Sequence, residues 1–160
     1  MRSKGKTSAG LLMYRRRAGN LEVFLVHPGG PYGIKRDAAS WSIPKGEYEA
    51  GEEPIEVAKR EFCEETGFSP RGEFIPLSPV RQSGGKVVTA WAFEGDCDPS
   101  NLKSNTFSME WPPRSGRQQV FPEVDRGDWF PIAKAEEKII SAQAALLHEL
   151  SRILKERGEE

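Results

Sequence analysis

Residues 46–68 read GEYEAGEEPIEVAKREFCEETGF, a stretch with eight glutamates and a helical spacing of its apolar side chains. Pro54 suits the first position of a helix, where its missing N–H costs no hydrogen bond. Gly67 suits the left-handed position just past the end of a helix. The sequence therefore predicts a helix over 54–66, and the rest of the chain is interpreted outward from it.

Three carboxylates of this predicted helix share one side. With ~100° of rotation per residue, Glu61, Glu64 and Glu65 fall within an arc of about 100°. This arc borders the apolar face that contains Ile55. A solvated surface helix more naturally alternates its charges, because like charges four positions apart are destabilising. Oxygen ligands select hard cations such as Mg²⁺ or Mn²⁺. On geometry alone, a metal-binding face and an ordinary charged solvent face remain equally open.

Charge is distributed unevenly along the chain, although the net charge is only −1. Residues 1–45 carry nine Lys or Arg against Glu22 and Asp37, a balance of +7. Residues 46–73 carry nine Glu against three basic residues, a balance of −6. An acidic block beside a basic segment suits a metal ion with a phosphorylated ligand. Composition alone favours a simpler interpretation, a solvated acidic helix beside a basic tail.

The order of residues in this stretch decides between these interpretations. Gly46 is followed after five residues by Glu52, and after seven more by REFCEETGF at 60–68. This matches the Nudix box G-x5-E-x7-R-E-U-x-E-E-x-G-U, in which U is a bulky apolar residue. The preceding WSIPKG at 41–46 is similar to the W-x-x-P-K-G lead-in of many nucleotide-cleaving members. The chain thus resembles a Nudix hydrolase.

The resemblance implies a fold and a chemistry. The fold is a mixed α/β (α+β) structure, an α/β/α sandwich around a mixed β-sheet, here with a C-terminal amphipathic helix. The reaction is hydrolysis of a nucleoside diphosphate linked to another group, with Mg²⁺ or Mn²⁺ as cofactor. The residues that match the metal site are Gly46, Glu61, Glu64 and Glu65, and those that match catalytic positions are Arg60, Glu61 and Glu64. Arg60 matches an arginine that orients carboxylates, whereas Glu52 and Gly67 match structural positions of the motif.

Outside the box, a few residues are candidates for substrate binding or catalysis. Glu123 lies six residues before Trp129, where Nudix proteins often place a loop glutamate that completes the metal site or acts as a base; Glu110 is the alternative. Lys45 is a candidate for phosphate contact. The candidates for binding the rest of the substrate are Trp111, Arg114 and Arg117. A solvated loop position is equally open for the two arginines, and for Trp111 a loop-anchoring role is favoured over stacking on a base. Lys35 and Arg36 are weaker candidates, and His27 is interpreted as structural.

Residue patterns predict the remaining elements of one domain over 8–157, preceded by a flexible basic terminus at 1–7. The expected strands are 9–14, 21–27, 41–43, 74–79, 87–93 and a short extended segment at 128–130. The span 101–123, rich in Pro, Gly and Arg, is expected to be an irregular binding loop. Apolar residues recur at helical spacing near the C-terminus and predict an amphipathic helix there: Ile139, Ala142, Leu146, Leu150 and Ile153.

Composition narrows the class of protein. Hydrophobic residues make up 37% of the chain, and no apolar run approaches the ~20 residues of a membrane span. No signal peptide is indicated, and two cysteines without CxxC spacing fit a reducing cytoplasm. The near-neutral charge makes a nucleic-acid partner unexpected. We expect a small phosphorylated substrate and a monomer or homodimer.

The subfamily markers leave several substrates open. The chain lacks both the tyrosine past the box that marks some diadenosine-polyphosphate hydrolases and the proline that marks some sugar-nucleotide hydrolases. The lead-in favours a nucleoside triphosphate or dinucleoside polyphosphate. The alternatives are a diphosphoinositol polyphosphate and a non-catalytic module that binds a nucleotide and regulates a partner.

Overall fold

The two central strands of the sheet are predicted by the sequence, and the computed structural model, which describes residues 6–158, extends both. β1 (Thr7–Arg17) and β2 (Asn20–Pro28) form an antiparallel hairpin. Ala18 and Gly19 connect them with φ of 55° and 81°. A two-residue turn with positive φ at both positions matches the right-handed twist of its strands.

Within residues 6–158 the main sheet has seven strands, in the order β4-β6-β1-β2-β9, with β3 beside β1 and β5 beside β6. The sheet is mixed, because β1 and β6 run parallel whereas the other pairs are antiparallel. β7 and β8 form a separate two-stranded sheet. The bounds are β3 (Lys45–Glu47), α1 (Pro54–Thr66), β4 (Ile75–Pro76), β5 (Val80–Arg81), β6 (Val87–Glu94), β7 (Thr106–Glu110), β8 (Gln118–Pro122), β9 (Val124–Pro131), α2 (Ile132–Lys138) and α3 (Ala144–Glu156).

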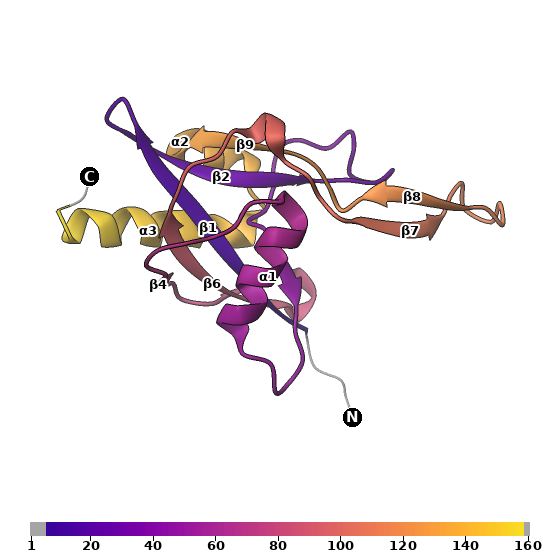
Figure 1. The fold of residues 1–160 in the computed structure, drawn as a ribbon, viewed down its shortest axis with the longest axis horizontal. Helices are drawn as coiled ribbons and strands as arrows, with labels where there is room; N and C mark the ends of the chain where they lie inside the picture. Colours follow the sequence, from indigo (N-terminus) through magenta and orange to yellow (C-terminus); the bar gives the residue numbers. More distant parts are fainter. Residues whose placement is uncertain (1–5, 159–160) are drawn as a thin grey trace.

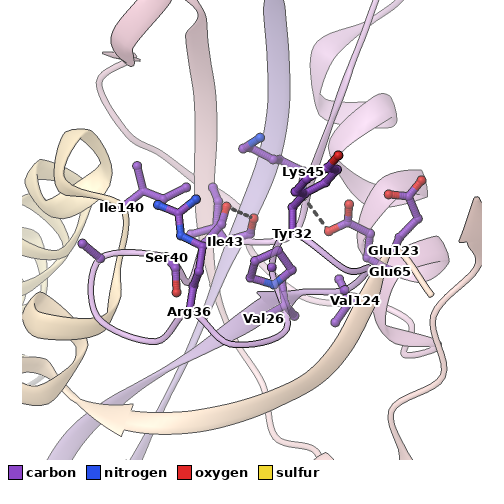
Figure 2. Close-up of a pocket in the computed structure, with 15 residues that line it drawn as sticks. Val26, Tyr32, Arg36, Ser40, Ile43, Lys45, Glu65, Glu123, Val124 and Ile140 are labelled. Carbon is purple, nitrogen blue, oxygen red and sulfur yellow. Dashed lines mark hydrogen bonds between the residues drawn. The ribbon is translucent and has the colours of Figure 1, made fainter. Parts of the chain in front are cut away.

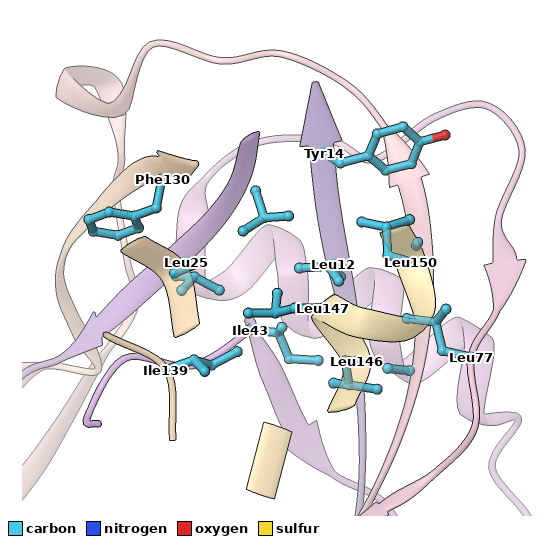
Figure 3. Packing of buried hydrophobic residues seen from close by; sticks show 14 of the residues in the cluster. Leu12, Tyr14, Leu25, Ile43, Leu77, Phe130, Ile139, Leu146, Leu147 and Leu150 are labelled. Atoms are coloured by element: carbon cyan, nitrogen blue, oxygen red, sulfur yellow. The ribbon is translucent and has the colours of Figure 1, made fainter. Parts of the chain in front are cut away.

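Helices cover both faces of the main sheet (Figure 1). Alternate residues of β1 contribute to two cores: Leu11 and Met13 belong to the core that contains Phe62 of α1. Leu12 and Tyr14 belong to the core on the opposite face, together with the leucines of α3 (Figure 3). The expected α/β/α sandwich around a mixed sheet is therefore confirmed, as is the C-terminal amphipathic helix.

Some boundaries differ from those expected. The span 101–123 is not irregular but contains the β7–β8 hairpin, which projects from the body at the end opposite the C-terminus (Figure 1). The strand expected at 41–43 consists of isolated bridges, and that expected at 74–79 is a strand only at β4. The expected C-terminal helix is divided into α2 and α3, and Ile139 and Ala142 lie in the connection.

The described part of the chain also bears on the terminus and on membranes. Residues 1–5 of the terminus expected to be flexible lie outside the described residues, whereas Thr7 already belongs to β1. No helix between residues 6 and 158 combines the length and the apolar character needed to cross a membrane.

Candidate active site

The helix α1 begins and ends where the sequence predicts. Pro54 is its first residue, and Gly67 follows it with φ of 81° while donating its N–H to the Cys63 carbonyl at 2.8 Å. Its buried side packs against the sheet through Val57, Ala58 and Phe62. The carboxylates of the box are thus held on a helix whose buried side is packed against the sheet.

Arg60 lies among three carboxylates of the box. Its guanidinium nitrogens lie 3.5 Å from a Glu52 carboxylate oxygen, 3.6 Å from one of Glu61 and 3.8 Å from one of Glu64. Because Arg60 is half exposed, each pair adds little to stability. Together the pairs restrict where the carboxylates point, which is the orienting role that the resemblance implies for Arg60.

Glu61 packs directly on the backbone of Gly46 in β3. A Cβ atom at residue 46 would lie 2.1 Å from the Glu61 carboxyl carbon, so only glycine admits the carboxyl group there. Burial, and then the charge of Glu64, raise the pKa of Glu61 above its ordinary value, and Arg60 opposes the shift. The close approach of glycine and glutamate therefore holds a carboxylate where its charge is poorly solvated.

Glu65 is enclosed between α1 and β3. Its Oε1 accepts a hydrogen bond from the Lys45 backbone N–H at 3.3 Å. Burial raises the pKa of Glu65 to about 8; Lys45 opposes this shift, and the charges of Glu61 and Glu123 add to it. Burial likewise lowers the pKa of the Lys45 ammonium. The site thus holds a partly buried acid and a partly buried base side by side.

The chemistry of these donors fits a hard divalent cation. All of the candidate side-chain ligands are carboxylates. Burial disfavours the negative charge of Glu61 and Glu65 and raises the pKa of both. A cation such as Mg²⁺ or Mn²⁺ would offset this charge. Among residues 6–158, no group of three or more His, Cys, Asp or Glu side chains is already arranged to hold a metal ion. Glu61, Glu64 and Glu65 fit the ion by type and charge, and binding it would draw their side chains together.

Two cavities in the described part of the chain meet at these carboxylates. The carboxylate cavity, of about 420 Å³, is lined by Ser8, Lys45, Gly46, Glu47, Glu61, Glu65, Asn105 and Glu123. The side cavity, of about 440 Å³, is lined by Val26, Pro28, Gly29, Tyr32, Gly33, Arg36, Ala39, Ser40, Ser42, Ile43, Lys45, Glu65, Glu123, Val124 and Ile140. Lys45, Glu65 and Glu123 line both. Figure 2 shows these three at one end of the side cavity, with Arg36, Ser40 and Ile140 toward the other.

Glu123 reaches the site from the connection between β8 and β9. Its backbone N–H donates to the Asn105 carbonyl at 2.9 Å, and its carbonyl accepts from the Gly29 N–H at 3.0 Å. Asn105 in turn donates its N–H to the Glu64 carbonyl at 2.8 Å. The backbone of Glu123 is thereby tied to the end of α1, which places its carboxylate at the junction of the two cavities (Figure 2).

The other candidates lie on the β7–β8 hairpin. The Trp111 ring meets the Tyr32 ring edge to face, with centroids 5.3 Å apart, and Tyr32 lines the side cavity. Arg114 and Arg117 lie in the exposed turn of the hairpin and line neither cavity, so their contact with substrate stays a prediction. Glu110 accepts a hydrogen bond at 2.6 Å from the backbone of the same turn. Of the two candidate glutamates outside the box, only Glu123 lines these cavities.

Comparison with known proteins identifies the family. A family model described as the NUDIX domain matches residues 5–150. The chain belongs to the Nudix family. This confirms the Nudix hydrolase assignment at the level of the family, and the Nudix box occupies the junction of β3 and α1, beside both cavities.

Individual relatives agree with this assignment. The chain is 28% identical over 135 residues to an RNA pyrophosphohydrolase of Brucella anthropi, covering 74% of this chain and 72% of that protein. The structure of a C. elegans Ap4A hydrolase in a binary complex matches with a TM-score of 0.63 and 22% identity, over 94% of this chain and 98% of the other. The Nudix domain of Shewanella oneidensis NrtR with ADP ribose matches with a TM-score of 0.67 and 15% identity, over 96% and 90%. At these identities the two structures show the fold alone.

Sequence reasoning missed most of the wall of the side cavity. Pro28, Tyr32 and Ile140 received no role from the sequence, although all three line this cavity. One available signal was the loop Gly29-Gly30-Pro31 followed by an aromatic residue, placed between two strands. Asn105 gives no such signal, because its contribution is a backbone hydrogen bond.

Proposed function

We propose that this Nudix protein is a Mg²⁺- or Mn²⁺-dependent pyrophosphohydrolase of a nucleoside triphosphate or dinucleoside polyphosphate. The observation that carries the proposal is the junction of the two cavities at Lys45, Glu65 and Glu123. A phosphate chain at this junction lies within reach of both the carboxylates and a lysine. The side cavity then receives the rest of the substrate.

The chain's own groups have distinct roles in this proposal. Glu61, Glu64 and Glu65 hold the cation, which lowers the charge of the phosphate chain and activates water when bound. Glu123, whose carboxylate lies at the junction, accepts the proton of the attacking water. Lys45 contacts a phosphate oxygen. Arg60 orients the carboxylates and does not touch the substrate.

The lining of the side cavity favours a nucleotide over a diphosphoinositol polyphosphate. Its walls include the apolar side chains of Val26, Ile43, Val124 and Ile140, and the cationic side chains along it are Lys45 and Arg36. A flat base buries apolar surface in such a cavity. An inositol that carries phosphates on most of its carbons needs more cations than these. The relatives named as an RNA pyrophosphohydrolase and an Ap4A hydrolase support the same class.

A substrate screen with defined metals tests the proposal. The purified protein is incubated with nucleoside triphosphates, dinucleoside polyphosphates, ADP-ribose, a diphosphoinositol polyphosphate and a 5′-triphosphorylated RNA, and the products are identified. We expect cleavage of a nucleotide with Mg²⁺ or Mn²⁺ and none in EDTA. Full activity in EDTA would contradict the metal site. Tight nucleotide binding without turnover in any metal would instead support a regulatory module.

A further inference from the structure

His27 is a fully buried histidine beside the side cavity that the proposed reaction does not use. It lies near the end of β2, and its ring meets the Trp41 ring edge to face with centroids 5.1 Å apart. Its Nδ1 lies 2.8 Å from Oδ1 of Asp125 on β9, and its Nε2 faces the backbone carbonyl oxygen of Arg36. The side chain therefore bridges β9 and the loop that forms one wall of the side cavity.

Both partners of the His27 ring are oxygen acceptors. A carbonyl oxygen only accepts hydrogen bonds, and an ionised carboxylate only accepts them. A neutral imidazole carries one N–H and can satisfy only one of the two. The doubly protonated imidazolium satisfies both, and its charge then faces the Asp125 carboxylate. The contacts are thus complementary to the cationic ring.

The charged groups around His27 come from each element packed against it. On β9, the Arg126 guanidinium lies 3.7 Å from Asp125 and over the Trp41 ring. In the loop, Asp37 accepts a hydrogen bond from the Trp41 indole and pairs with Lys138 of α2. Among these groups Asp125 alone touches the ring, and it favours the cation.

The bond to His27 adds to the contacts that hold the middle of the loop, where the Arg36 N–H donates to the Gly33 carbonyl at 3.0 Å and Asp37 is bonded to Ser40, Trp41 and Lys138. The far end of the loop is tied to α2, because Ala39, Ser40 and Trp41 donate their backbone N–H groups to carbonyls of that helix. At its near end Gly29 is tied to Glu123. Arg36 lies between these anchors, and its side chain lines the side cavity (Figure 2).

We propose that His27 is a positioning residue whose imidazolium form bridges Asp125 and the Arg36 carbonyl and so holds the substrate-binding wall of the side cavity in place. The part that concerns substrate rests on the proposed function. Histidine side chains in general change their charge between about pH 5 and 8, so a bridge of this kind can be tested by varying the pH. Loss of the proton breaks one of the two bonds and so removes one of the contacts that position Arg36 in the wall, which weakens binding without touching the reacting atoms.

The protonation of His27 can be measured without any substrate. The chain has two histidines, and His148, which pairs with Glu136 on the exposed side of α3, can be replaced by glutamine. In this His148→Gln variant, ¹⁵N NMR of the single remaining ring reports its protons as the pH is raised. We expect both ring nitrogens of the folded protein to carry protons at pH 6. A ring with one proton at that pH would overturn the proposal, whatever the protein hydrolyses.

Kinetics then test the effect on binding. For the cleaved nucleotide, KM of the wild type and of His148→Gln should rise by about fivefold, the worth of one hydrogen bond, between pH 6 and pH 8.5. In His27→Gln, KM should be high and independent of pH over this range, while kcat changes less than twofold. Asp125→Asn keeps the His27 ring but removes the negative charge that favours the imidazolium. In this variant the rise in KM should therefore begin at a lower pH than in the wild type. A His27→Gln enzyme with the KM profile of the wild type would overturn the proposal. If His27→Gln does not fold, an Asp125→Asn enzyme whose KM rises at the same pH as that of the wild type would overturn it instead.

Discussion

Three glutamates on one side of α1 have different surroundings, although helical geometry places all three within one arc. Glu65 is enclosed and its pKa is raised to about 8 by burial. Glu61 is partly buried against Gly46, whereas Glu64 is largely exposed and pairs with Arg60. The exposed carboxylate is therefore the one that can be changed with the least effect on the fold, and it is the best test of the metal site.

Replacement of Glu64 by glutamine should separate catalysis from folding. Glutamine keeps the shape of the side chain but loses the charge that would hold a cation. We expect Glu64→Gln to lower kcat by about 10²–10⁴. Thermal unfolding should stay close to that of the wild type. Glu56→Gln, on the exposed side of the same helix beside Lys59, is the matched control and should retain full activity. Equal activity of the two folded variants would refute the assignment.

For individual residues, the sequence predicts a place in the site when that place depends only on spacing along one helix. Helical geometry places the box carboxylates together, and the motif identifies their neighbours. Neither predicts that Gly46 lies against Glu61 or that His27 bridges two segments, because those contacts join residues that are distant in the chain. They depend on the packing of the whole sheet.

Elements with a buried face are the ones that the sequence predicts well. The sequence predicts α1 to the residue, because a proline and a glycine mark its ends and an apolar face runs between them. The β7–β8 hairpin buries little, so its strands lack a strong apolar pattern, and the Pro and Gly residues of its turn suggest a loop instead. The alternation of Phe107 and Met109 with polar residues was the available signal.

The loop between β2 and β3 is the element that should distinguish substrates. Tyr32 lines the side cavity and contacts Trp111, although it is largely exposed. Tyr32→Ala should raise KM for the cleaved nucleotide by about fivefold or more, the loss of one aromatic contact with a base, and change kcat little. Ile34→Ala in the same loop is the control, because Ile34 is similarly exposed but does not line the cavity. Unchanged KM in Tyr32→Ala would place the base elsewhere.

In the molecule as a whole, the site has an energetic cost. The two apolar cores on either side of the sheet stabilise the fold. The carboxylate site works against them, because it holds Glu65 away from water with Glu61 and Glu123 nearby. A cation that binds only the folded protein stabilises it, by an amount that grows with the logarithm of the cation concentration above its Kd. Stability, pH and metal should therefore be linked in this protein.

The sign of this linkage follows from the pKa of Glu65, which is about 8 in the folded protein against an ordinary value of 4.5. Below pH 4.5 the carboxyl group is protonated in both states and costs nothing. As the pH rises toward 8, the unfolded chain releases the proton while the folded protein retains it, so the free energy of unfolding falls. In EDTA, the Tm of Glu65→Gln should exceed that of the wild type by at least about 3 °C at pH 8.5 and approach it at pH 5.

Addition of metal completes this test. Mg²⁺ or Mn²⁺ at pH 8 should raise the Tm of the wild type more than that of Glu65→Gln, because the variant lacks one carboxylate ligand. Glu56→Gln should follow the wild type in both EDTA and metal, since its side chain is exposed to solvent. Scanning calorimetry of the three proteins across pH gives all the comparisons. If the Tm of Glu65→Gln in EDTA falls with pH as steeply as that of the wild type, the cost of the site is not located at Glu65.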